Sequence, residues 1–167
     1  MDIYISSGKG TGKTPLSAFD NALFNAGIHN YNLIVLSSII PPGSIIKEKK
    51  YKSNPQEYGH RLYVVMSENR SREHNKCIGA AIGWYQIEDG RGVFVEHKTT
   101  GESEEAVVSN LNIEIMNSLS DLCRLRNIPF NRQKAHMKSS VSKITELASS
   151  VLVAAVYKSE PWNLSIM

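Results

Sequence analysis

The chain has 167 residues, of which 41% are hydrophobic and 21% are charged, a composition typical of one globular domain rather than a disordered chain. The formal net charge of +3 is too small to indicate a nucleic-acid partner. No hydrophobic run approaches the roughly 20 residues that span a membrane. Cys77 and Cys123 lack the CxxC spacing of a zinc site. We therefore expect one cytoplasmic domain over residues 1–167, without nucleic-acid partner, membrane partner or metal.

The first motif along the chain is rich in glycine. A short strand over Ile3–Ile5 leads into residues 6–14, which end in Gly-Lys-Thr as a Walker A phosphate-binding loop does. The first position of that motif holds Ser7 instead of glycine, and Pro15 follows at once. No later strand ends in the aspartate that would hold magnesium. The pattern favours a flexible turn before a helix over an NTPase site.

A helix is predicted from Pro15 to about Ala26, with Thr14 as N-cap and Gly27 as C-cap. Helical spacing gives it an apolar stripe made of Leu16, Phe19, Leu23 and Ala26. Asp20 borders this stripe, and a carboxylate against apolar surface is costly unless it is paired. Asp20 is therefore either a solvated edge residue or a carboxylate that binds a cationic ligand.

The apolar run over residues 32–40 carries two adjacent serines, Ser37 and Ser38, and is stopped by two prolines. A hydroxyl that leaves water needs a hydrogen-bond partner, so the pair is either a capped turn or a reactive site. No Gly-x-Ser-x-Gly elbow and no identifiable His/Asp partner accompany these serines, which argues against a hydrolase triad. The reactive alternative is chemistry made from the chain itself, in which Ser38 attacks the preceding carbonyl.

Periodicity and turn signals assign the remaining elements. We expect a surface loop over 44–57, strands over 61–66, 77–87, 93–98, 134–144 and 150–157, a loop over 67–76, a hairpin turn over 88–92, a helix over 103–125 and a tail over the last ten residues. Two helices with five or six mostly antiparallel strands predict an α+β fold.

Glu96 is the second carboxylate in an apolar setting. Strand alternation places it on one face with Phe94 and Lys98, while His97 points the other way. Glu96 either pairs with Lys98, lies at a solvated edge, or acts as a general acid. The five histidines are scattered without metal-ligand spacing.

Several segments, dense and in order, together resemble the pyruvoyl-dependent arginine decarboxylases. They are TPLSAFD (14–20), NAGI (25–28), NLI (32–34), SSIIPP (37–42), FVEH (94–97) and AAVY (154–157). The resemblance covers most of the chain. It implies a four-layer αββα sandwich that assembles as trimers or dimers of trimers, with active sites between subunits.

The resemblance also implies self-cleavage between Ser37 and Ser38, giving a small chain 1–37 and a large chain 38–167. Attack of the Ser38 hydroxyl on the Ser37 carbonyl would give an ester, β-elimination would leave dehydroalanine, and hydrolysis would release ammonia. The product is a covalent pyruvoyl group at position 38, and it serves in place of PLP as the electron sink, with no metal.

Residue roles follow from the same resemblance. Asp20 would pair with the guanidinium of the substrate arginine, Glu96 would be the proton donor, and Asn32 would support the pyruvoyl region. The methylene stem would lie among Leu16, Leu23 and Ile39. Arginine would form a Schiff base with the pyruvoyl ketone, lose CO₂ and leave as agmatine. The alternatives are a pyruvoyl-dependent decarboxylase of another amino acid and a non-processing structural relative.

Overall fold

The computed structural model describes residues 1–162, which form two α-helices and nine β-strands in two sheets. The helices are α1 (Pro15–Ala26) and α2 (Glu104–Leu125). The strands are β1 (Asp2–Gly12), β2 (Asn32–Val35), β3 (Ile39–Ile40), β4 (Ile45–Glu48), β5 (Arg61–Ser71), β6 (Cys77–Gln86), β7 (Gly92–Gly101), β8 (His136–Lys143) and β9 (Ala148–Glu160). The predicted α+β class is confirmed.

Both sheets are mostly antiparallel. The five-stranded sheet has the order β2-β5-β9-β1-β4, and its two outer pairings, β2 with β5 and β1 with β4, are parallel. The four-stranded sheet has the order β3-β7-β6-β8 and is antiparallel throughout. The β6–β7 hairpin turn lies where the sequence predicted it. Of the described residues, none belongs to a helix long and apolar enough to cross a bilayer.

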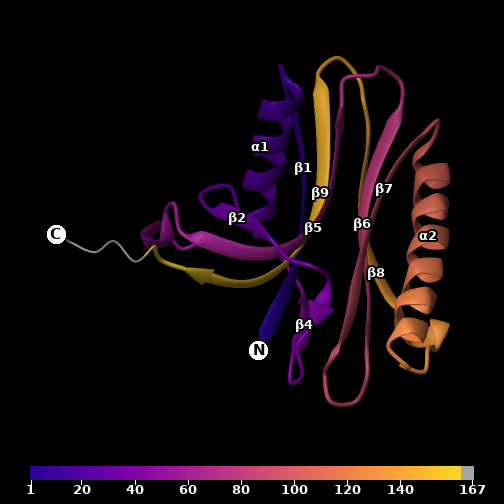
Figure 1. Cartoon of the computed structure of the whole chain (residues 1–167). Helices are drawn as coiled ribbons and strands as arrows, with labels where there is room; N and C mark the ends of the chain where they lie inside the picture. The colour runs from indigo at the N-terminus through magenta and orange to yellow at the C-terminus, as the bar shows by residue number, and fades with distance from the viewer. Residues whose placement is uncertain (163–167) are drawn as a thin grey trace.

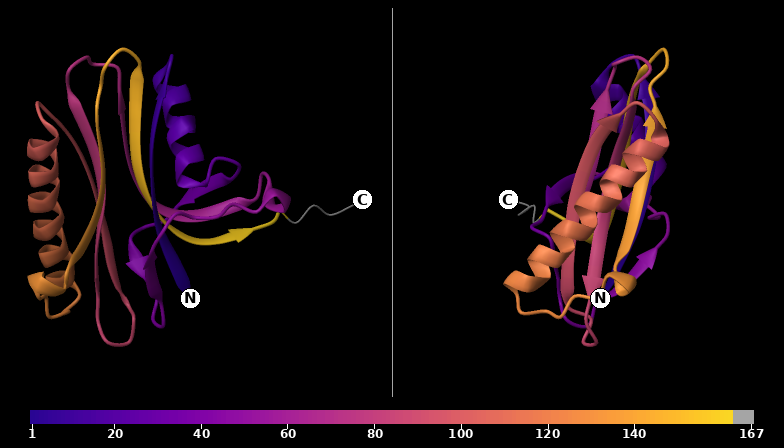
Figure 2. Two further views of the ribbon diagram at one scale, coloured as in Figure 1. Left: turned by 180° about the vertical axis from the view of Figure 1, so that it is seen from behind. Right: turned by 90° about the vertical axis from the view of Figure 1, so that its right-hand side faces the viewer.

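Clusters of buried hydrophobic residues hold the helices and sheets together, and Figures 1 and 2 show the two helices on opposite outer sides of the strands. Ala22 and Ala26 of α1 pack on the five-stranded sheet. The residues that fill the space between the two sheets include Val153 of β9 and Phe94 of β7. Leu111 and its neighbours along α2 pack on the four-stranded sheet. Each helix therefore packs on one sheet, and a separate hydrophobic cluster lies between the two sheets.

The glycine-rich segment is not a flexible turn, because β1 extends through it and pairs with β9 as far as Gly12. A Cβ on Gly8 would lie 2.0 Å from the carbonyl oxygen of Ala22, and one on Gly10 would lie 2.4 Å from the Ala22 nitrogen. Such distances are impossible for real atoms, so only glycine lets the α1 backbone approach β1 this closely. The predicted turn was wrong, and close helix packing is the reason.

Helix α1 begins and ends where the sequence predicted. The Thr14 hydroxyl accepts the Ser17 N–H at 3.0 Å, and Gly27 ends the helix in the left-handed region with φ 79°. The predicted apolar stripe was partly wrong, because Leu16 is 69% exposed. The helix instead turns its alanines toward the glycines of β1, since only small side chains fit between two backbones so close together.

Other predicted segments changed in extent. The apolar run over 32–40 is two short strands separated by residues 36–38, and the predicted surface loop contains β4 and the 3₁₀ turn Pro55–Glu57. Residues 67–71 of the predicted loop belong to β5, and residues 158–160 of the predicted tail belong to β9. Residues 163–167 of that tail lie outside the described residues. Cys77 and Cys123 are both buried free thiols.

Candidate active site

Ser38 and Glu96, 58 residues apart in the sequence, meet in the structure. The Ser38 hydroxyl lies 2.7 Å from each carboxylate oxygen of Glu96 and donates its hydrogen bond to them. The contact follows from the topology, because β3 pairs with β7 and places Ile39 opposite Val93. Ser38 precedes β3 directly, so its side chain reaches the carboxylate three residues along β7. The serine and the acid that the sequence singled out therefore form one site.

The backbone around Ser38 is fixed by three hydrogen bonds of 2.8 Å. The Ile39 N–H donates to the Ser37 carbonyl, which makes a tight three-residue turn centred on Ser38. The Phe94 N–H donates to the Ser38 carbonyl. The Tyr157 hydroxyl donates to the Ile39 carbonyl. Each carbonyl from 37 to 39 thus has its own donor.

This arrangement can perform an intramolecular acyl shift. The carboxylate of Glu96 is placed to accept the proton of the Ser38 hydroxyl, as a general base does. The Ile39 N–H withdraws electron density from the Ser37 carbonyl, which is the carbonyl that a neighbouring hydroxyl would attack. Ser37 is exposed and Ser38 is half-buried, so water reaches this peptide. The site therefore combines a nucleophile, a base and a polarised carbonyl.

Tyr157 and the Phe94 N–H were missed by the sequence analysis. Tyr157 packs at the edge of the cluster between the sheets, with its ring 6.2 Å from that of Phe94 in a T-shaped arrangement. Burial raises the pKa of Tyr157 far above its ordinary value, and the charge of Glu96 raises it further. Its hydroxyl is therefore a neutral donor. Strand alternation with Val153 and Ala155 could have placed this side chain between the sheets.

Histidine 97 lies on the other face of β7, as predicted. Its Nε2 atom is 2.8 Å from the Ser118 hydroxyl of α2, while its backbone carbonyl accepts from Ser67 of β5. These contacts fix β7 between α2 and the five-stranded sheet. The neighbouring Glu96 is thereby directed into the space between the sheets, towards Ser38.

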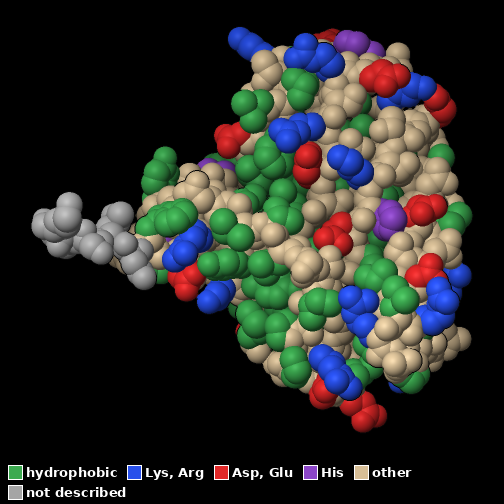
Figure 3. Space-filling model, in the orientation of Figure 1, with side chains coloured by type: hydrophobic (Ala, Val, Ile, Leu, Met, Phe, Trp, Pro, Cys, Tyr) green, Lys and Arg blue, Asp and Glu red, His purple; other side chains and the backbone are tan. Residues whose placement is uncertain are grey.

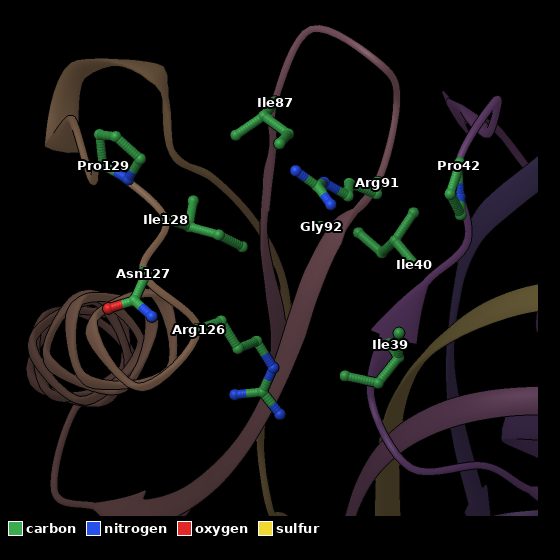
Figure 4. A pocket seen from close by; sticks show the side chains of 10 residues that line it. All are labelled: Ile39, Ile40, Pro42, Ile87, Arg91, Gly92, Arg126, Asn127, Ile128 and Pro129. Carbon is green, nitrogen blue, oxygen red and sulfur yellow. The ribbon is translucent and has the colours of Figure 1, made fainter.

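A cavity of about 360 Å³ lies beside Ile39 (Figure 4). It is bounded by β3, the β6–β7 hairpin and the turn that follows α2. In Figure 4 the Arg126 side chain extends from the end of α2 towards Ile39, across the cavity. The lining residues are Ile39, Ile40, Pro42, Ile87, Arg91, Gly92, Arg126, Asn127, Ile128 and Pro129. Ile39 therefore borders both Ser38 and an open, largely apolar cavity that also holds two arginines.

The residues expected to hold the substrate side chain lie elsewhere. Asp20 and Leu16 are exposed on α1, and Leu23 is buried beneath that helix with 9% exposure. Because α1 covers the outer face of the five-stranded sheet, that sheet separates Asp20 from Ser38 within one chain. Asn32 begins β2, and its side-chain amide donates to the Gly59 carbonyl at 2.7 Å.

The fold and the site define a class of protein. A serine hydrogen-bonded to a carboxylate, beside a peptide carbonyl that accepts from a backbone N–H, is an arrangement in an α+β protein that can support an acyl shift within the chain. The chain belongs to the pyruvoyl-dependent arginine decarboxylase family, whose family model matches residues 2–161.

Individual relatives agree with this membership. The chain is 37% identical over 105 residues to the pyruvoyl-dependent arginine decarboxylase of Picrophilus torridus, an alignment that covers 61% of this chain and 57% of that protein. It is 36% identical over 110 residues to the enzyme of the same name from Thermoplasma volcanium, covering 65% and 60%. With pyruvoyl-dependent arginine decarboxylase 2 of Methanosarcina acetivorans it shares 29% identity over 143 residues, covering 84% and 76%. The first two alignments thus span less than two thirds of those relatives.

Proposed function

We propose that this protein is a pyruvoyl-dependent arginine decarboxylase of the cytoplasm, which converts L-arginine to agmatine and CO₂ after it cleaves itself between Ser37 and Ser38. Cleavage would divide its one domain into chains 1–37 and 38–167. One observation carries the proposal, the 2.7 Å contact of the Ser38 hydroxyl with both oxygens of Glu96. Family membership supplies the reaction class that fits this contact.

Self-cleavage uses groups that the structure brings together. The Ser38 Oγ bonds to the Ser37 carbonyl carbon, its proton passes to Glu96, and the C–N bond between the two residues breaks as the nitrogen takes up a proton. The resulting ester loses the Ser37 carboxylate by β-elimination, with removal of the Ser38 α-proton. Water then hydrolyses the dehydroalanine that remains and releases ammonia. The Ile39 N–H stabilises the oxyanion of the first step.

The surroundings of position 38 fit a pyruvoyl group. The Phe94 N–H already donates a hydrogen bond to the Ser38 carbonyl. This hydrogen bond would remain after cleavage, because the carbonyl stays with the large chain. The β3–β7 pairing that follows anchors the new chain end. A pyruvoyl group supplies a ketone that condenses with an amine and accepts the electrons released when CO₂ leaves.

Three residues of the chain would serve decarboxylation, each in its own way. Glu96 lies where it can hold a proton beside position 38 and donate it to the substrate α-carbon after CO₂ has left. Ile39 is 46% exposed and presents an apolar wall to the methylene stem. Asn32, through its bond to Gly59, holds β2 and so supports the segment that leads to Ser38.

A second copy of the chain would complete the site. Asp20 and Leu16 lie across the five-stranded sheet from Ser38, so in this proposal they act on the site of a neighbouring subunit, together with Leu23 once that side chain shifts. Exposed apolar side chains on α1 and on the β2–β4 segment support such packing, and Figure 3 shows hydrophobic side chains gathered there. We propose four-layer αββα subunits in trimers or dimers of trimers.

Intact-mass measurement and denaturing electrophoresis test self-cleavage. The wild type should give two fragments, with a pyruvoyl mass at the start of the larger one. Ser38→Ala should stay intact and inactive, whereas Ser37→Ala should still cleave because it keeps the nucleophile. An intact wild-type chain would instead identify a non-processing structural relative.

Mixing two inactive variants tests the shared site. When Ser38→Ala and Asp20→Ala chains are co-expressed, about a quarter of the sites of a symmetric assembly should combine an intact Ser38 with an intact Asp20 from the neighbour. Agmatine formation should then reappear. Absence of this recovery would place the whole site within one chain.

A substrate comparison tests the choice of arginine. Citrulline has nearly the same shape as arginine but carries no charge, so the wild type should strongly prefer arginine. Asp20→Asn should lose most of that preference through a higher KM for arginine. A wild type that decarboxylates another amino acid better would favour the alternative substrate class.

A further inference from the structure

Tyr157 contacts the self-cleavage site from the opposite sheet. Residue 157 belongs to β9 of the five-stranded sheet, whereas Ile39 belongs to β3 of the four-stranded sheet. The 2.8 Å bond from the Tyr157 hydroxyl to the Ile39 carbonyl therefore spans the space between the two sheets. The bond ties the residue after the reactive serine to the centre of the other sheet.

The direction of the Ile39 backbone explains why this bond matters. β3 is an edge strand that pairs only with β7 in the described sheet. The Ser38 carbonyl points to β7, where Phe94 donates to it, and neighbouring residues of a strand present their polar groups to opposite sides. The N–H and the carbonyl of Ile39 accordingly both point away from β7. The N–H meets the Ser37 carbonyl, and the carbonyl meets Tyr157.

These two hydrogen bonds connect Tyr157 to the scissile peptide through a single residue, Ile39. The Tyr157 hydroxyl fixes the Ile39 carbonyl, and the same residue directs its N–H at the Ser37 carbonyl. Without the hydroxyl, an edge carbonyl would turn to water and the short β3 segment of two residues would lose its anchor on that side. The donor that stabilises the oxyanion would then be less well aimed.

We propose that Tyr157 is a positioning residue for self-cleavage, which keeps the Ile39 N–H directed at the scissile Ser37 carbonyl. The inference rests on the proposed self-cleavage and assigns to it a residue outside the serine–glutamate pair. The tyrosine touches neither reacting atom and acts through Ile39.

The ring of Tyr157 provides part of the same support. It packs beside Phe94, whose own N–H holds the Ser38 carbonyl. Removal of the hydroxyl alone leaves this packing in place, so Tyr157→Phe separates the hydrogen bond from the ring. Tyr157→Ala would remove both and is the less informative variant.

Tyr63 offers a matched control. It is also a partly buried tyrosine in the five-stranded sheet, and its hydroxyl donates to the Glu160 carboxylate at 2.7 Å rather than to the backbone beside Ser38. Self-cleavage of each chain is monitored by denaturing electrophoresis after cell-free synthesis. Tyr157→Phe should slow cleavage by about tenfold, the change expected when the transition state loses one hydrogen bond. Tyr63→Phe should cleave at the wild-type rate.

Two further measurements distinguish positioning from a general loss of stability. Unfolding of both tyrosine variants is measured in the Ser38→Ala background, where every chain stays intact, and similar stabilities are expected. Hydroxylamine, which cleaves esters, should release less small chain from Tyr157→Phe than from wild type, because less ester forms. The rate profile against pH should be lowered in parallel, since the tyrosine stays neutral and Glu96 is untouched.

The outcomes separate this inference from the proposed function. If the wild type does not cleave, self-cleavage itself is wrong. If the wild type cleaves and Tyr157→Phe cleaves equally fast, only the role of Tyr157 is wrong. Equal slowing in Tyr63→Phe, or a shifted inflection of the pH profile, would likewise overturn the positioning role.

Discussion

Two segments of this chain carry motif-like sequences, and the structure treats them in opposite ways. The glycines of β1 mimic a phosphate-binding loop, yet each is explained by the backbone of α1 lying against it. Ser38 lies in an irregular link between two short strands, and its hydroxyl meets a carboxylate 58 residues away. Packing accounts fully for the first segment. In the second, packing leaves a hydroxyl beside a carboxylate, and that difference marks the candidate active site.

The largest effect should come from Glu96→Gln. Glutamine keeps the shape and can still accept a hydrogen bond from Ser38, but it cannot take the proton. Self-cleavage should slow by about a hundredfold or more, in the range for loss of a general base. Time courses on denaturing gels measure it. Glu68→Gln, which changes a carboxylate of β5 in the cavity that Glu96 also lines, is the control, and an equal loss there would contradict the role of Glu96.

Gly8→Ala should unfold or severely destabilise the protein. The new methyl carbon would collide with the Ala22 carbonyl, and neither backbone can move without breaking β1 or α1. We expect a loss of about 3 kcal/mol or more in the free energy of unfolding, measured by denaturant titration in the Ser38→Ala background. Gly59→Ala is a control with open space and a strained φ of 79°, and its loss should be smaller.

Thr14→Ala should have an intermediate effect. It removes the hydroxyl that accepts the Ser17 N–H and half of the capping box of α1. The free energy of unfolding should fall by about 1 kcal/mol. Ser17→Ala, which removes the reciprocal bond to the Thr14 N–H, should lose a similar amount. Unchanged stability in both variants would show that the cap contributes little.

Lys13→Ala should change almost nothing. The Lys13 side chain is exposed. If the segment were a phosphate-binding loop, this lysine would contact the phosphates of the nucleotide. Stability should stay within about 0.5 kcal/mol of wild type. Magnesium–ATP should not raise the melting temperature of either protein. A nucleotide-dependent rise that Lys13→Ala abolishes would restore the phosphate-binding interpretation of β1.

The sequence was most informative where pattern and chemistry are local. The caps at Thr14 and Gly27, the β6–β7 hairpin and the face of Glu96 are each set by a few neighbouring residues, and the structure agrees with them. The extent of β1 could not be predicted, because its glycines are required by the close approach of α1, and that helix lies beside them only after folding. The Tyr157 bond depends on the pairing of two separate sheets, which no local pattern contains.

The candidate site was predictable only in part for the same reason. Ser38 and Glu96 were named from an out-of-place hydroxyl and an out-of-place carboxylate, but their contact depends on the register of β3 against β7. Asp20 was chosen in the same way, and it lies on another side of the molecule. Polar residues in apolar patterns thus identify candidates, while topology decides which of them meet.

The place of β1 has a consequence for what cleavage would do to the molecule. β1 lies inside the five-stranded sheet between β9 and β4, with α1 packed on it, and all of its residues precede Ser37. The short fragment would therefore stay attached to the long one by non-covalent contacts, because β1 remains paired within the sheet. Gel filtration without denaturant should show no change in size on maturation. Maturation would change covalent bonds only at residues 37 and 38, and neither fragment made separately would contain the complete five-stranded sheet, because β1 and β2 belong to the short fragment and β4, β5 and β9 to the long one.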